Sequence, residues 1–196
     1  MIQEDGTGGG YKAKVDKNNR SHTDSVIHTE QQDATNKGLS YNLNTGTIGL
    51  TSSSESAVMY VKNNDSEGRT LKVDAIAVGI GSAATLSDLP VITIVRNPTA
   101  GTVISDAAAV DMNQNRNFGS SETLTVDAYK GAEGKTLTGG DDIIIFYQAE
   151  GGRLFASIDL DVPKGSSIGV QITPTGLSAG TMNIYCALVC HLKEIV

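Results

Sequence analysis

The chain has 196 residues, of which 39% are hydrophobic and 19% are charged, and its formal net charge is −7. Many Gly, Ser, Thr and Asn residues with few charges are typical of an all-β domain with tight turns, and they disfavour a helical bundle. No block of Lys and Arg stands out, which argues against nucleic acid as a partner, and the longest apolar runs of about ten residues are too short to span a bilayer.

Residues 1–38 are polar and show little hydrophobic periodicity. The glycines of 6–12 resemble a phosphate-binding loop, but that loop needs Ser or Thr after its lysine, and Lys12 is followed by Ala13. Apolar and basic residues alternate over 11–15, as in one short strand. We therefore expect an extended N-terminal arm that is mobile or ordered against a neighbouring subunit. The polar start of the chain also predicts no signal peptide.

From Tyr41 onward, short apolar stretches recur between turn residues, and no stretch predicts a helix. Residues 106–141 are the least regular part, and long loops of that kind usually contact a partner. The expected strands are 57–61, 71–80, 91–97, 102–105, a brief one near 123–129, 143–149, 153–162, 167–172 and 181–192.

Two of these strands alternate clearly. In 153–162 the apolar residues share one face, while Phe155, Ser157, Asp159 and Asp161 take the solvent face. In 181–192 both cysteines, Cys186 and Cys190, fall on the core face and His191 on the opposite one. Four residues of strand separate the cysteines by roughly 13 Å, which excludes a disulfide between them and suits a reducing compartment such as the cytoplasm.

Eight or nine strands without βαβ alternation predict an all-β fold, an antiparallel β-sandwich of the jelly-roll type. An immunoglobulin-like sandwich is the second choice, although its Cys–Trp–Cys pattern is missing. The predicted domains are an extended polar arm over 1–38 and the β-sandwich over 39–196.

Motifs for catalysis or metal binding are weak. There is no GxSxG elbow, and the histidines His22, His28 and His191 lack the HxH spacing of a metal-binding jelly roll. Because neighbouring strand residues point to opposite faces, His191 cannot activate Cys190. We therefore expect no enzyme activity.

Three acidic groups have a plain structural interpretation beside a functional one. Asp159 and Asp161 could form a glycosidase pair, but a solvated strand face explains them. Acidic turns at 63–65 and 141–142 could hold Ca²⁺, but turns use the same residue types. We expect no cofactor and no metal.

Several phrases together resemble a known family: YKAKVDKNNR at 11–20, YNLNTGTIGLTS at 41–52, SAVMYVKNND at 56–65, and VRNPTAGTVIS with NRNFGSS within 95–121. They are similar to virion structural proteins of tailed bacteriophages, and the similarity spans most of the chain. The resemblance implies a jelly-roll subunit that coats or cements a capsid, or that joins tail and fibre parts, often as a trimer with an arm reaching a neighbour.

The expected function is therefore that of a non-enzymatic capsid decoration or cement protein, a homo-oligomer and by preference a trimer, on the virion surface after synthesis in the host cytoplasm. A tail, baseplate or head-fibre adaptor is the alternative, and a carbohydrate-binding jelly roll is disfavoured by the absence of Trp. The expected partner is the major capsid protein or another virion subunit, with no nucleic acid and no membrane.

The expected partner-binding residues lie in the arm and in one loop: Tyr11, Lys12, Val15 and Arg20, then Asn115, Arg116, Asn117 and Phe118. For the loop, an equal alternative is an internal anchor in which Arg116 satisfies buried carbonyls. The sequence leaves that choice open.

Overall fold

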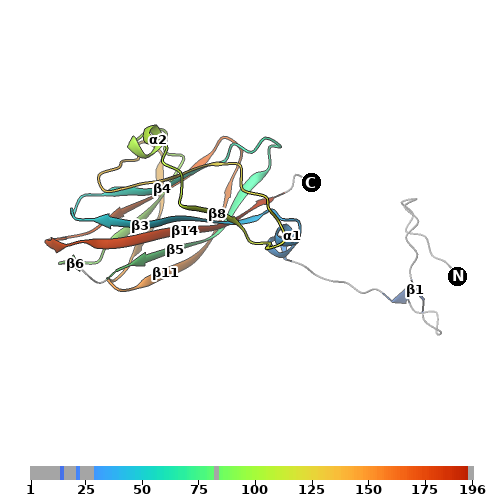
Figure 1. Cartoon of the computed structure of the whole chain (residues 1–196), viewed down its shortest axis with the longest axis horizontal. Coiled ribbons are helices and arrows are strands. Elements are labelled where there is room, and N and C mark those ends of the chain that lie inside the picture. Colours follow the sequence, from blue (N-terminus) through green and yellow to red (C-terminus); the bar gives the residue numbers. More distant parts are fainter. Residues whose placement is uncertain (1–13, 16–20, 23–28, 82–83, 194–196) are drawn as a thin grey trace.

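The computed structural model describes residues 14–15, 21–22, 29–81 and 84–193. Two five-stranded antiparallel sheets pack face to face (Figure 1). The first sheet has the order β8 (Met112–Asn115), β3 (Ser40–Leu50), β14 (Met182–Lys193), β5 (Thr70–Ile80) and β11 (Arg153–Val162). The second has the order β9 (Asp127–Lys130), β4 (Ser56–Lys62), β12 (Ser167–Thr173), β7 (Val91–Arg96) and β10 (Asp141–Tyr147).

Four nested pairs define the topology. β3 pairs with β14, β4 with β12, β5 with β11, and β7 with β10, so that the first of these eight strands meets the last and the fourth meets the fifth. Nested pairing split over two sheets is the jelly-roll arrangement. The prediction of an all-β sandwich is confirmed.

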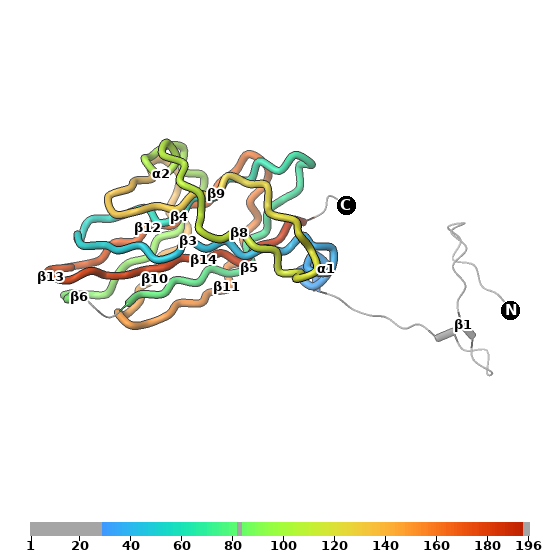
Figure 2. The backbone as a smooth tube through the Cα atoms, in the orientation of Figure 1, coloured from blue at the N-terminus to red at the C-terminus, as the bar shows by residue number. Residues whose placement is uncertain are grey.

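The remaining elements are small. They are the strand pairs β1 (Lys14–Val15) with β2 (Ser21–His22) and β6 (Ala84–Thr85) with β13 (Ala179–Gly180), and the helices α1 (Glu30–Asn36) and α2 (Thr102–Asp106). None of the helices in the described part of the chain is long and apolar enough to span a membrane. The long segment between β7 and β10 contains α2, β8 and β9, and Figure 2 shows it passing from α2 toward α1 and back.

The core lies between the sheets and follows the alternation in the sequence. All six residues predicted for the core face of β14 are at most 3% exposed: Met182, Ile184, Cys186, Leu188, Cys190 and Leu192. Both cysteines are free, as predicted, and burial raises the pKa of each thiol to about 12. The apolar face predicted for β11 also packs on this core, from Leu154 to Val162.

The prediction of no helix is wrong at two places. Residues 102–105, expected as a strand, form most of α2. Gly101 precedes them with φ 134°, and Val103 inserts into a small apolar cluster outside the main core, with Ala57 and Leu137. A run of β-branched residues this short does not fix a strand when an adjacent glycine turns the chain toward a different packing partner.

The other helix that was not predicted, α1, lies within the range expected to form the arm. Thr29 caps it through a capping box: the Thr29 hydroxyl accepts from Gln32 N, and the Gln32 side chain accepts from Thr29 N. Its Ala34 is buried, and the helix contacts β14 and β3. Residues 29–38 therefore pack against the sandwich.

Candidate partner-binding site

The predicted arm residues are only partly placed. Tyr11, Lys12 and Arg20 lie outside the described residues. Val15 belongs to β1, of which only the backbone is described. Their role in binding stays a prediction.

The predicted loop residues follow β8, and we call residues 116–123 the anchored loop. Asn115 fixes its start with three hydrogen bonds. Asn115 Nδ2 donates to Gly38 O at 2.7 Å and to Glu122 O at 3.3 Å, and Asn115 Oδ1 accepts from Asn117 N at 2.8 Å. One side chain thus joins both ends of the loop to Gly38, the second residue after α1.

Asn117 and Arg116 add further links. Asn117 Nδ2 donates to Asn36 O at 3.3 Å, and its Oδ1 accepts from Gly119 N at 3.0 Å. Arg116 donates to the hydroxyl of buried Ser40 at 3.3 Å and, through its backbone N–H, to Ser40 O at 2.8 Å. These contacts hold the first three residues of the NRNF phrase to the body, although the Arg116 side chain bonds a hydroxyl and not a buried carbonyl.

The helix that receives these bonds is itself held to the sheet. Gln31 Nε2 donates to Asp74 Oδ2 at 2.9 Å, and the same oxygen lies 3.0 Å from Nδ1 of buried His191. Lys193 forms an ion pair with Glu30 at 3.1 Å. α1 is therefore tied to β5 and β14 by side chains, which makes it a firm support for the anchored loop.

Gly38 is the position where helix and loop meet. Its φ is 74°, a conformation that favours glycine, and a Cβ here would lie 3.0 Å from Ser120 Oγ. Glycine at position 38 therefore allows the chain to turn after α1 and allows Ser120 of the loop to pack closely against the backbone.

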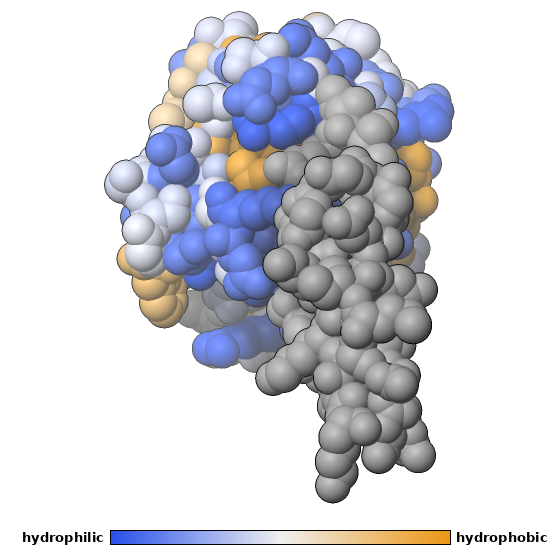
Figure 3. All heavy atoms as spheres, turned by 90° about the vertical axis from the view of Figure 1, so that its right-hand side faces the viewer, coloured by the Kyte–Doolittle hydropathy of each residue, from blue (hydrophilic) through white to orange (hydrophobic). Residues whose placement is uncertain are grey.

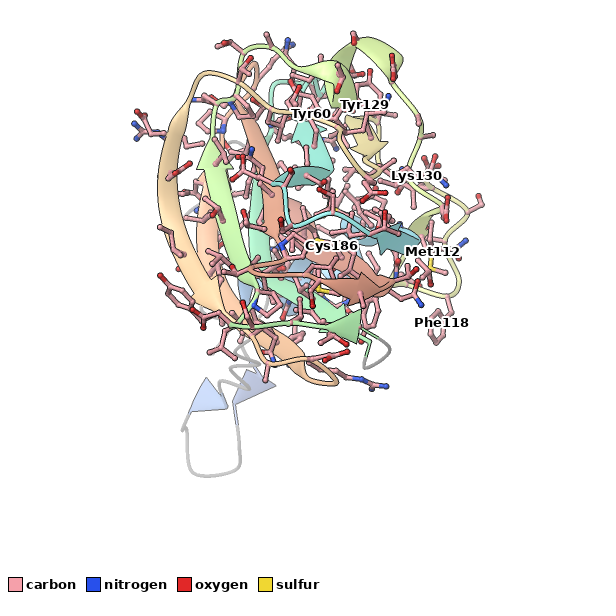
Figure 4. The ribbon with its side chains drawn as sticks, turned by 90° about the vertical axis from the view of Figure 1, so that its left-hand side faces the viewer. Tyr60, Met112, Phe118, Tyr129, Lys130 and Cys186 are labelled. Atoms are coloured by element: carbon pink, nitrogen blue, oxygen red, sulfur yellow. The ribbon has the colours of Figure 1, made fainter. Side chains whose placement is uncertain are left out.

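Phe118 is the one residue of the phrase that faces outward. It is 101% exposed, and no other large hydrophobic residue of the described chain approaches that value. Figure 4 shows Phe118 pointing away from the body, with Met112, 46% exposed, on the same side of the molecule. A shallow hollow of about 280 Å³ lies beside it, lined mainly by polar residues of β8 and the anchored loop.

The surroundings of this end of the molecule are polar. Figure 3 shows this end, and the surface visible beside the grey residues is mostly hydrophilic with a few small hydrophobic areas. Phe118 is thus an aromatic side chain held out from a polar surface by a loop that is hydrogen-bonded to the body of the protein.

The carboxylates considered for catalysis are engaged otherwise. Lys72 Nζ lies 3.0 Å from Asp159 and 3.4 Å from Asp161, so one ammonium bridges the pair on an exposed strand face. Cys190 Sγ lies toward Tyr41 O in the core, whereas the His191 ring faces Asp74 on the other side of the sheet. This arrangement matches the plain structural interpretation of both features.

The acidic turns also have partners. Asp65 is buried and binds Arg69 through both oxygens, and these hydrogen bonds hold the pKa of Asp65 below its usual range. Asp141 pairs with Arg96. Among the described residues, no group of three or more His, Cys, Asp and Glu side chains is arranged to hold a metal ion.

Two features of this end escaped the sequence analysis. The capping box of α1 has a readable signal, Thr29 followed three residues later by Gln32. The contact between α1 and the anchored loop has no such signal in the sequence, because residues 36 and 117 are 81 positions apart and only the fold brings them together.

No protein-family model matches the chain, and no curated protein matches it in sequence. Among solved structures, the chain is similar to the mitogen of Yersinia pseudotuberculosis, with 9% identity, a TM-score of 0.34, and coverage of 79% of this chain and 88% of that one. It is also similar to the structure of tomato aspermy virus, with 10% identity, a TM-score of 0.31, and coverage of 90% and 84%.

A third similar structure is the D431N mutant of the VP2 protein of infectious bursal disease virus. Its identity is 11%, its TM-score is 0.20, and the match covers 80% of this chain and 35% of that one. At such TM-scores these likenesses carry no argument about this chain.

Proposed function

We propose that this chain is a non-enzymatic structural protein of a bacteriophage virion that decorates or cements the outer capsid as a homo-oligomer, with a trimer preferred. Its partner is the major capsid protein or a neighbouring virion subunit. The viral assignment is supported by the phrases that resemble those of tailed-phage structural proteins, and the assembly role by the geometry of the α1 end.

The observation that carries the proposal is Phe118 on the anchored loop. An exposed phenylalanine gains from burial at an interface, where aromatic side chains are frequent anchors. Asn115 and Asn117 hold the loop to α1, so that little conformational entropy is lost when Phe118 is bound. The loop and the root of the predicted arm thus lie at one end of the sandwich.

In this proposal the residues divide into two roles. Asn115, Arg116 and Asn117 position the loop, and Phe118 makes the contact. Many copies bind one lattice, so each contact can be weak while the assembly is stable.

The test is co-sedimentation of the purified protein with capsids that lack it, comparing wild type with Phe118→Ser. Phe155→Ser is the matched control, since Phe155 is 70% exposed and lies on β11, at the opposite edge of the same sheet from β8. We expect Phe118→Ser to weaken binding by more than about tenfold and Phe155→Ser to leave it unchanged.

Equal binding by the wild type and both variants would show that Phe118 is not part of the interface. Failure of the wild type to bind capsids at all would refute the decoration role. Both exposed side chains are free of core contacts, so circular dichroism should show native folding for each variant.

A further inference from the structure

The second sheet ends in an unusual edge strand. β10 pairs with β7 on one side, and among the described residues no strand pairs with its other side. Its sequence, DDIIIFY, carries charges only at its first two residues and contains no Lys or Pro. Edge strands of soluble proteins are commonly protected by such residues, because their free backbone groups recruit other strands.

The exposed apolar side chains of β10 also favour association at this edge. On the outer face of the sheet, Ile143 is 38% exposed, Ile145 53% and Tyr147 66%. On the inner face, Ile144 and Phe146 are only partly buried against the core. Both faces of the strand therefore offer apolar surface to a strand placed beside it.

The edges of β9 and β8 are protected. Residues 108–110 run along β9, where Lys130 N donates to Ala108 O at 2.8 Å and Val110 N to Ala128 O at 3.2 Å. Residues 122–124 cover β8 through its asparagines, since Asn113 Nδ2 donates to Leu124 O at 2.9 Å. Neither edge is open to a new strand in the way that β10 is.

The edge of β11 is protected by charge and shape. Arg153, Asp159 and Asp161 lie on its exposed face, and the strand bulges at Asp159, which has φ 47°. Charges and bulges of this kind prevent edge-to-edge pairing. β10 also has a bulge, beside Asp142, but its charges are confined to its first two residues and no described segment covers residues 143–147.

The chain itself supplies a segment that fits this edge. β1 and β2 form a sheet of two residues per strand, and a pair this short is marginal in water without a third strand. Residues 11–22 carry four of the fifteen Lys and Arg residues of the chain and one acidic residue, Asp16, whereas the chain as a whole has a net charge of −7. Over 11–15, apolar residues alternate with lysines, the pattern of a strand that can extend an apolar sheet face.

The charges match at one end of β10. Asp141 and Asp142 begin β10, and Asp142 lies beside its bulge. Asp141 is paired with Arg96. A lysine of the segment placed beside Asp142 would form an ion pair with its carboxylate.

We propose that the open edge of β10 binds residues 11–22 of a second copy of this chain, which join the sheet through β1 or β2 as additional strands. Resting on the proposed assembly function, this contact builds the homo-oligomer. One copy gives the segment and the next gives the edge, so the interface is heterologous and can close into a ring such as a trimer. Residues 23–28 span at most about 20 Å when extended, so the neighbour's β10 must lie near α1.

The first test is the mass of the full chain in solution by light scattering, without capsids. We expect an oligomer for wild type and dissociation for Ile145→Lys, with a dissociation constant raised more than about tenfold. Phe155→Lys is the control, because it places the same charge on an exposed apolar site at the edge of the other sheet. A wild-type monomer up to about 100 µM, or an intact Ile145→Lys oligomer, overturns the proposal.

A charge exchange tests the choice of segment. Lys14→Glu should weaken the oligomer, and combining it with Asp142→Lys should restore most of the loss, since the pair is then reversed in sign. If Asp142→Lys restores nothing, the proposed contact is wrong. Phe118→Ser should leave the oligomer intact, so a failure of capsid binding and a failure of this contact are told apart.

A cysteine pair tests whether the segment comes from another copy. Chains with only Val15→Cys are mixed with chains with only Ile143→Cys under mild oxidation, since Ile143 is exposed and adjoins Asp142, the residue placed beside Lys14. The native thiols are buried, with pKa values of about 12, and do not compete. A disulfide between the two chains supports the proposal, whereas its formation only within a doubly substituted chain, or its absence, overturns it.

Discussion

Asn115 is the residue on which the anchored loop most depends. The loss in free energy of unfolding that its truncation should cause can be worked out from its hydrogen bonds. Asn115→Ala removes three hydrogen bonds, to Gly38 O, to Glu122 O and from Asn117 N. Net contributions of about 1 kcal/mol each would sum to about 3 kcal/mol. Gly38 O keeps the hydroxyl of Tyr41 at 3.1 Å and the exposed Glu122 gains water, so we expect a loss of about 2 kcal/mol.

The assay is urea unfolding followed by circular dichroism, with a thermal melt as a second measure. For a chain of this size the loss corresponds to a fall in Tm of about 4–8 °C. Gln114→Ala is the matched control, because Gln114 is the preceding strand residue and its side chain is exposed. A change below about 0.5 kcal/mol for Asn115→Ala, equal to that of the control, would refute the view that this side chain anchors the loop.

Three further outcomes follow from the fold. Gly38→Ala should cost about 1–2 kcal/mol in urea unfolding, because alanine must adopt a positive φ; no loss would mean that the turn relaxes freely. The lowered pKa of Asp65 predicts that its pairing with Arg69 stabilises the fold above about pH 4 and is lost as the pH falls further; stability measured against pH should slope less steeply in Asp65→Asn, and an unchanged slope contradicts this. Cys186 and Cys190 should react with a thiol reagent only as the protein unfolds, so rapid labelling of native protein, followed by absorbance, would contradict their burial.

The strands with strict alternation were predictable, because one buried face imposes a period of two on the sequence. The apolar faces of β11 and β14 follow this rule, and both pack in the core. What alternation cannot provide is the position of a strand in its sheet. The apolar run over 143–149 predicts a strand but not its place in a sheet, and the structure puts β10 at an edge, with Ile145 half exposed.

The candidate site, too, could be predicted only in part from the sequence. The sequence singled out the NRNF phrase but left the choice between anchor and contact open. The structure shows Asn115 and Asn117 turned to α1 and Phe118 turned to solvent, a difference set by contacts more than 70 positions apart in the chain. Long-range hydrogen bonds of this kind leave no local pattern, whereas the capping box of α1 does.

The central claim is that the protein is a structural part of a virion, and the most direct measurement is the amount of this chain in purified virions, determined by quantitative mass spectrometry against the major capsid protein. We expect a fixed ratio of many copies per particle, retained through gradient purification. Absence of the chain from purified virions would contradict a structural role in the particle.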